Sequence, residues 1–263
     1  MDFKTPTPED RERLCQRPDG KRQVMYQSWE KLLFLHWEVD PEEIQKMLPE
    51  GLRVDLFENR AYVGIVPFYM WNIRPRYMPA VPWISYFLEL NVRTYVHDAN
   101  GVPGVWFFSL DTNQPLAAYL GRRFFHMPYT QAQMKAERRS EGLIHYQCHR
   151  KGTPDEEEAE YVYQGTSDPA PAVLGTLEYF LAERYLLYAV NKKNGTLYAG
   201  RVFHQAYPLQ KAEVSRFSIN PIKQAGICGV DSDPVHALYS EGVDVLAYPI
   251  EKQAINIKIG SNS

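Results

Sequence analysis

The segment Phe87-Leu-Glu-Leu-Asn-Val-Arg-Thr-Tyr-Val96 carries the pattern that decides the fold class. Successive side chains of a β-strand point to opposite faces of its sheet. One face of this segment would carry an apolar row, typical of a protein core: Leu88, Leu90, Val92, Thr94 and Val96. The other face would carry an acid, an amide, a guanidinium group and two aromatic rings: Phe87, Glu89, Asn91, Arg93 and Tyr95. The pattern predicts a strand with one core face and one polar face.

The polar face has two interpretations. It could be a solvent-exposed face whose side chains pair across neighbouring strands. It could instead line a binding site, and the aromatic residues at its two ends, Phe87 and Tyr95, favour this interpretation.

Short strands and a few short helices dominate the rest of the chain. Strands are predicted over residues 32–37, 52–57, 61–70, 105–111, 143–149, 160–164, 185–190, 196–204, 212–219 and 242–249. Helices are predicted over residues 8–16, 41–48, 116–125 and 177–182. The pair Asn194-Gly195 is a strong hairpin signal. This composition favours an antiparallel, β-rich α+β domain over a doubly wound sheet.

The domain organisation is expected to be simple. Residues 1–24 form a polar N-terminal arm, residues 25–252 form a single domain, and residues 253–263 form a C-terminal tail.

The composition argues against several classes of function. The 263 residues include 29 Lys and Arg against 32 Asp and Glu, a net charge of −3, so nucleic-acid binding through phosphate contacts is not expected. No apolar run approaches the roughly 20 residues that span a bilayer, and the N-terminus lacks an apolar signal segment. Cys15, Cys148 and Cys228 are scattered, as in reduced cytoplasmic thiols. We therefore expect a cytoplasmic protein with no nucleic-acid or membrane partner, and a homo-oligomer remains open.

A metal site is not expected. His145 and His149 would share one metal on a helix, but their neighbours predict a strand, where four residues span about 13 Å. The motifs for a nucleophile elbow, a P-loop, a dinucleotide fold and a zinc peptidase are also missing, and no cofactor is expected.

The segment from Ser109 to Tyr129 joins a predicted strand to a predicted helix. Asp111, at the end of the strand, is a candidate cap for that helix. Arg122 and Arg123 could bind a carboxylate or form surface ion pairs.

Several segments together resemble one family. They are 33–37 (Leu-Phe-Leu-His-Trp), 48–52 (Leu-Pro-Glu-Gly-Leu), 66–68, 87–96, 108–111, 127–129, 181–185 (Leu-Ala-Glu-Arg-Tyr) and 207–213. On these residues the chain resembles the YqjF-like proteins (domain of unknown function 2071), which belong with the acetoacetate decarboxylase-like fold. The resemblance covers residues 29–249. It implies a double β-sheet cone or barrel around a central cavity, with a few short helices.

The resemblance also implies a departure from decarboxylase chemistry. The decarboxylases hold a Schiff-base lysine just after a proline, where this chain has Pro128-Tyr129-Thr130. Neither a phenol nor a hydroxyl can supply the amine that an imine needs. Their active-site arginine falls near Trp37 or Glu38 and is lost too. Their glutamate on a neighbouring strand corresponds to Glu89.

Three hypotheses follow. In the first, the protein is an enzyme acting on a small organic acid or carbonyl compound, with Glu89 moving protons and Tyr129 donating a hydrogen bond. Arg93 would hold a carboxylate or order Glu89. In the second, the cavity binds a small apolar or aromatic ligand without catalysis. The third is a structural or partner-binding protein. The candidate ligand-binding residues are His36, Trp37, Asn91, Arg93, Tyr95 and Arg122.

Overall fold

The computed structural model describes residues 2–139 and 142–256. Its strands are β1 (Met25–Val39), β2 (Leu52–Val54), β3 (Ala61–Pro75), β4 (Phe87–Asp98), β5 (Pro103–Thr112), β6 (Tyr129–Arg138), β7 (Ile144–Arg150), β8 (Ala159–Gly165), β9 (Leu186–Asn191), β10 (Thr196–Phe203), β11 (Leu209–Arg216) and β12 (His236–Asn256). Its helices are α1 (Pro8–Leu14), α2 (Pro41–Met47), α3 (Pro115–Phe124), α4 (Leu177–Ala182), α5 (Asn220–Gln224) and the 3₁₀ turn η2 (Asp155–Glu157).

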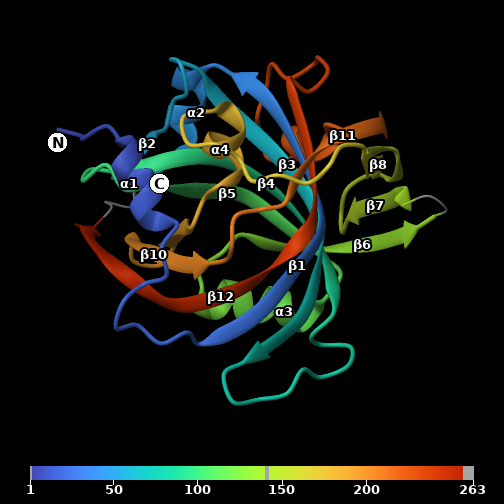
Figure 1. The fold of residues 1–263 in the computed structure, drawn as a ribbon, viewed down its shortest axis with the longest axis horizontal. Helices are drawn as coiled ribbons and strands as arrows, with labels where there is room; N and C mark the ends of the chain where they lie inside the picture. The colour runs from blue at the N-terminus through green and yellow to red at the C-terminus, as the bar shows by residue number, and fades with distance from the viewer. Residues whose placement is uncertain (1, 140–141, 257–263) are drawn as a thin grey trace.

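Strand pairing closes part of the sheet into a ring. The pairs run β12–β1, β1–β3, β3–β4, β4–β5, β5–β9, β9–β10 and β10–β12, so the last pair returns to the first strand. The β1–β12 pair is long, from Met25↔Ala247 to His36↔His236, and both strands sweep across the molecule in Figure 1. A closed ring has an inner face, and that face holds the site described below.

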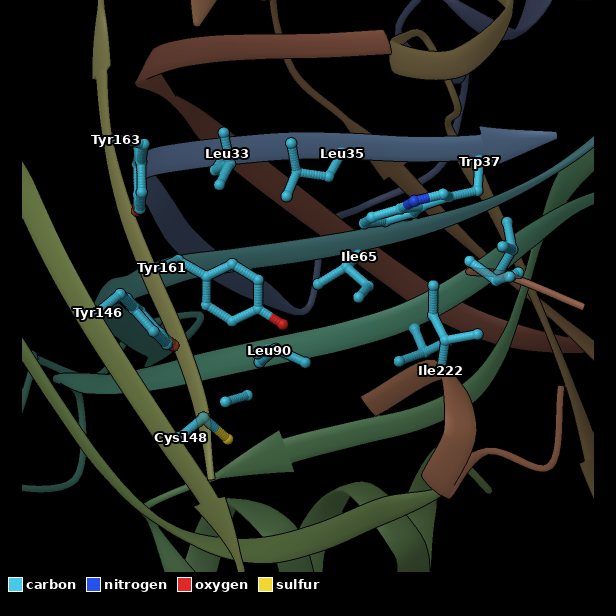
Figure 2. Close-up of a cluster of buried hydrophobic side chains, with 14 of the residues drawn as sticks. Leu33, Leu35, Trp37, Ile65, Leu90, Tyr146, Cys148, Tyr161, Tyr163 and Ile222 are labelled. Atoms are coloured by element: carbon cyan, nitrogen blue, oxygen red, sulfur yellow. The ribbon is translucent and has the colours of Figure 1, made fainter. Parts of the chain in front are cut away.

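A second layer covers one outer side of the ring. Strands β6, β7, β8 and β11 form it, and it joins the ring through β5–β6 at one edge and β11–β12 at the other. Figure 1 shows β6, β7 and β8 projecting to one side of β1, β3 and β4. The main hydrophobic core lies between these layers. Figure 2 shows Leu33, Ile65 and Leu90 in this cluster with the aromatic rings of Tyr146 and Tyr161.

Both faces of β4 are buried because the strand lies between the ring interior and this core. Leu88, Leu90 and Val92 belong to the core between the layers, as the alternation predicts. The polar face is also buried, so the interpretation of it as solvent-exposed is wrong. The predicted β-rich α+β fold is confirmed.

Most predicted elements are present, and the differences have local causes. Strand β6 was not predicted from the sequence because its Thr, Gln, Lys and Glu residues interrupt the apolar alternation. Asp111 does not cap α3, because its carboxylate accepts two 2.8 Å hydrogen bonds from Arg150. The Gln114 side chain caps the helix instead by accepting from the Leu116 N–H.

The two predicted chain ends differ from a plain arm and tail. Helix α1 carries Arg11, which bonds to Asp55 in the body of the domain, and Leu14 is buried. Strand β12 continues to Asn256, and residues 257–263 of the predicted tail lie outside the described residues. Within the described ranges, no helix has the length and apolarity to cross a membrane.

Candidate functional site

A cavity of about 220 Å³ lies inside the ring of strands. Every strand of the ring contributes lining residues, and α3 covers part of it through Ala117, Leu120 and Gly121. Most of the lining is apolar, as in typical small-molecule sites. Glu89, Asn91 and Arg93 line it in a row because they alternate with the core residues of β4. The cavity is therefore an apolar chamber with a polar strip along one strand.

Tyr129 is placed opposite this strip by α3 and β6. The helix ends before Met127 and Pro128, and Tyr129 starts β6 beside Leu110 of β5. Gly121 of α3 leaves room for the ring, since a Cβ at that position would overlap the Tyr129 ring atoms. The Arg122 guanidinium group also donates to the Tyr129 carbonyl oxygen at 2.9 Å. The tyrosine side chain thus enters the cavity from a tightly fitted turn.

Glu89 and Tyr129 form the central pair of the site. The Tyr129 hydroxyl donates a 2.7 Å hydrogen bond to Glu89 Oε2. Burial raises the pKa of Glu89 to about 7, although the hydrogen bond from Tyr129 acts in the opposite direction. Burial and the neighbouring Glu89 also raise the pKa of Tyr129 well above its usual value. At neutral pH the carboxyl group can therefore both accept and release a proton, while the phenol stays protonated.

Arg93 and Asn91 line the same cavity but do not bond to Glu89. Arg93 Nη2 donates to the Leu181 carbonyl oxygen at 3.1 Å, and its guanidinium carbon lies 5.5 Å from the Phe34 ring centroid. The Asn91 side-chain oxygen is buried and has no hydrogen-bond partner in residues 2–139 and 142–256. The structure thus gives no support to the idea that Arg93 orders Glu89.

Four other predicted ligand-binding residues do not line the cavity. His36 Nε2 lies 2.6 Å from the Tyr95 hydroxyl, and both side chains are fully buried against each other. Trp37 packs in the core between the layers, with its indole N–H donating to the Ser232 carbonyl oxygen at 3.0 Å. Arg122 is exposed, and its guanidinium group points to backbone rather than to the cavity.

Sequence reasoning missed several lining residues from other elements. They include Gln27, Trp29, Arg184, Arg201, Tyr207 and Tyr248. Arg184 and Tyr207 lie in segments that carry the family resemblance, and this resemblance could have identified them as candidate lining residues. Their side-chain directions depend on the ring closure, which no local pattern reveals.

The donor set is unlike a metal centre. In the described part of the chain no three His, Cys, Asp or Glu side chains gather closely enough to hold a metal ion. His145 of β7 bonds to Glu160 of β8, and His149 of β7 bonds to the Thr153 carbonyl oxygen, so the two histidines have separate partners. Among the described residues, no lysine lines the cavity.

Comparison with known proteins now identifies the family. The model of the DUF2071 family, described as "Uncharacterized conserved protein", matches residues 26–244. This chain belongs to the DUF2071 family. It is also 39% identical over 237 residues to the uncharacterized protein YqjF of Bacillus subtilis, covering 89% of this chain and 94% of that protein. The family predicted from the sequence is confirmed.

Solved structures confirm the fold of this DUF2071 protein. Acetoacetate decarboxylase from Legionella pneumophila matches with a TM-score of 0.60 at 12% identity, covering 92% of each chain. The enduracididine biosynthesis enzyme MppR, complexed with pyruvate, matches with a TM-score of 0.57 at 12% identity, covering 88% of this chain and 91% of the other. An acetoacetate decarboxylase-like enzyme from Sphingomonas wittichii matches with a TM-score of 0.56 at 12% identity, covering 90% and 97%. At such low identity the likeness establishes the acetoacetate decarboxylase-like fold alone.

Proposed function

We propose that this protein is an enzyme that catalyses proton transfer on a small organic acid or carbonyl compound inside the ring cavity. Glu89 is the acid–base group and Tyr129 is the hydrogen-bond donor. The observation that carries the proposal is the 2.7 Å bond from the Tyr129 hydroxyl to a buried Glu89 in an otherwise apolar cavity.

The pair has the properties that proton abstraction next to a carbonyl group requires. Among the described residues Glu89 has no ion pair, and burial raises its pKa to about 7, close to an ordinary working pH. When Glu89 takes a proton from the substrate carbon, its carboxylic acid can donate to the Tyr129 oxygen. The Tyr129 hydroxyl is then free to donate to the oxyanion that forms on the substrate.

Imine chemistry is not part of this proposal. The positions after Pro128 hold Tyr129 and Thr130, and neither side chain can form an imine. We expect borohydride treatment with acetoacetate or pyruvate to leave no covalent adduct, checked by intact-mass spectrometry. A mass increase mapped to any lysine would contradict this expectation.

Deuterium exchange tests the proposed reaction. Small ketones and oxo acids are incubated with the protein in D₂O, and exchange at the carbon next to the carbonyl group is followed by NMR. For any compound that exchanges, Glu89→Gln should slow exchange by about 10²–10⁴-fold, the usual contribution of general acid–base catalysis. The control variant Glu50→Gln changes an exposed glutamate and should leave the rate unchanged. Equal rates in Glu89→Gln and the wild type would refute the role of Glu89.

A second candidate function is non-catalytic binding of a small apolar or aromatic ligand. The apolar lining favours it, with side chains such as Leu32, Phe68, Phe107 and Leu110 around the cavity. In that case a carbonyl ligand would bind, yet no exchange would occur with either the wild type or Glu89→Gln.

A further inference from the structure

The cavity has a second polar region, which is separate from the Glu89–Tyr129 pair. Arg93 and Arg184 both line it, and both side chains are buried, with 8% and 6% of their surface exposed. Their guanidinium carbons lie 5.7 Å and 5.0 Å from the centroid of the same Tyr95 ring. Two positive groups therefore share one end of the cavity.

Two buried carboxyl groups lie near this end, and they have different partners. Glu183 accepts hydrogen bonds from the Tyr185 hydroxyl and the Tyr207 N–H. Asp55 accepts hydrogen bonds from Arg184 Nη1 at 2.7 Å and from Arg11 at 2.7 and 2.8 Å, so one carboxylate serves two guanidinium groups. Within residues 2–139 and 142–256, Arg93 makes no ion pair, and the Leu181 carbonyl oxygen is its hydrogen-bond acceptor. Asp55 thus neutralises part of the charge of Arg11 and Arg184, while the Arg93 guanidinium group bonds to a backbone carbonyl oxygen.

Hydrogen-bonding capacity is left over as well. Arg93 Nε and Arg184 Nη2 are buried and have no acceptor in the part of the chain that the structure describes. An arginine side chain cannot escape this cost by losing its proton at neutral pH, because its pKa lies far above 7. Burial lowers the pKa of Arg184 to about 10, which still leaves it charged. Buried charge and free N–H donors together form a site for an oxyanion.

Glu89 lies at the other end of the polar strip. Glu89 and Arg93 are four residues apart on one strand, a span of about 13 Å at roughly 3.3 Å per residue. Burial, with the Arg93 charge adding to it, lowers the pKa of His204 to about 4. The pKa of Glu89, in contrast, responds to burial, Tyr129 and Asp111. The guanidinium end and the proton-transfer end are thus electrostatically distinct.

We propose that Arg93 and Arg184 bind the carboxylate of an elongated monocarboxylate with an apolar body, whose far end reaches Glu89 and Tyr129. The placement of the far end rests on the proposed function, whereas the carboxylate anchor does not. A ligand that touches both ends needs several carbon atoms between its carboxylate and its reacting carbon. The apolar side chains around the strip, such as Phe68 and Phe107, suit such a body.

Calorimetric titration of the full chain tests the anchor with defined probes. Hexanoate and 4-phenylbutyrate should bind at least tenfold more tightly than the matched amides, hexanamide and 4-phenylbutanamide. Acetate should bind at least tenfold more weakly than hexanoate, because it cannot fill the apolar body of the cavity. Equal affinity for acid and amide would overturn the proposal.

Variants locate the anchor. Arg93→Gln should abolish the tenfold preference for the acid, and Arg93→Lys should reduce it, because lysine keeps the charge but loses the planar pair of donors. Arg17→Gln changes an exposed arginine outside the cavity lining and serves as the matched control, with unchanged affinity. Thermal melting checks the fold, and Arg93→Gln should melt no lower than the wild type because it removes a buried charge that forms no ion pair with any described residue. A folded Arg93→Gln or Arg93→Lys with undiminished preference would overturn the anchor.

Glu89→Gln separates this inference from the proposed function. We expect Glu89→Gln to keep the preference for hexanoate over hexanamide, because the anchor that recognises the carboxylate lies at the other end. If binding persists and deuterium exchange of a bound oxo acid also persists, the anchor stands and the proposed function fails. If the acid and the amide bind equally while exchange depends on Glu89, the anchor fails and the proposed function stands.

Discussion

Glu89 and Asp55 are both buried carboxyl groups, yet their surroundings push their ionisation in opposite directions. Asp55 is 2% exposed and receives hydrogen bonds from Arg11 and Arg184. Burial alone would raise its pKa, but the two guanidinium groups outweigh burial and lower the pKa below its usual value. Glu89 is 4% exposed and has a phenol as its partner, and burial raises its pKa to about 7. The difference lies in the neighbouring cations, because both groups are equally removed from water.

Asp111 lies between these two cases. Arg150 binds both of its oxygens at 2.8 Å, so within the described ranges it has one guanidinium partner, Asp55 has two and Glu89 has none. Burial still raises the pKa of Asp111, against the effect of Arg150. The three groups show that one arginine partner does not fully offset the rise in pKa that burial causes. A carboxyl group without any cation becomes the group that can exchange protons near neutral pH.

Removal of the Asp55 charge should have the largest effect on stability. Asp55→Asn leaves Arg11 and Arg184 without a counterion, and breaking a buried pair costs about 3–5 kcal/mol of unfolding free energy. Urea unfolding followed by tryptophan fluorescence measures this loss. Asp168→Asn, at an exposed aspartate, is the control and should change stability by less than about 0.5 kcal/mol. A loss below about 1 kcal/mol in Asp55→Asn would break the comparison, since Asp55 would then behave as an ordinary surface residue.

The raised pKa of Glu89 should make the folded protein less stable as the pH rises, whereas a lowered pKa such as that of Asp55 has the opposite effect. Its folded pKa of about 7 exceeds the usual 4.5, so the folded protein keeps a proton that the unfolded chain has released. Stability from this proton is fully present below pH 4.5 and is lost as the pH rises through 7, by about 3 kcal/mol in total. Between pH 5 and pH 8 the wild type should lose about 2 kcal/mol more than Glu89→Gln in urea unfolding. Parallel pH profiles for the two proteins would show that Glu89 is not a raised-pKa acid.

The Tyr129 hydroxyl should have the smallest effect. Its hydrogen bond lowers the pKa of Glu89, so Tyr129→Phe should raise that pKa further. We expect the pH at which Glu89 titrates, followed by NMR of a ¹³C-labelled carboxyl group, to rise by about one unit or less, or about 1 kcal/mol. Tyr119→Phe, at an exposed tyrosine of α3, should leave it unchanged. A downward shift in Tyr129→Phe would mean that the phenol does not stabilise the ionised form.

Local patterns predicted the strand that carries the site but not all of its surroundings. Alternation in residues 87–96 identified the two faces of β4, and the family resemblance paired Glu89 with Tyr129. The same reasoning put His36 and Trp37 among the ligand-binding candidates because they lie in a segment that carries the resemblance. In the fold, His36 pairs with Tyr95 and Trp37 joins the core between the layers. The direction of each side chain on β1 follows from bulges and pairing with β3, which the segment itself does not show.

The sequence by itself determined the strand-rich fold, the family and the two faces of β4, because these depend on local alternation and on residue identity. Only the tertiary structure decided that the polar face is buried, that Arg93 has no carboxylate partner among the described residues, and that Arg184 and Arg11 share Asp55. Arg11 and Arg184 lie 44 and 129 positions from Asp55 in the sequence, and only the folded chain brings both into contact with its carboxylate. The ionisation of a buried group depends on its neighbours in space, so the folded structure and not the local sequence sets the pKa of Glu89.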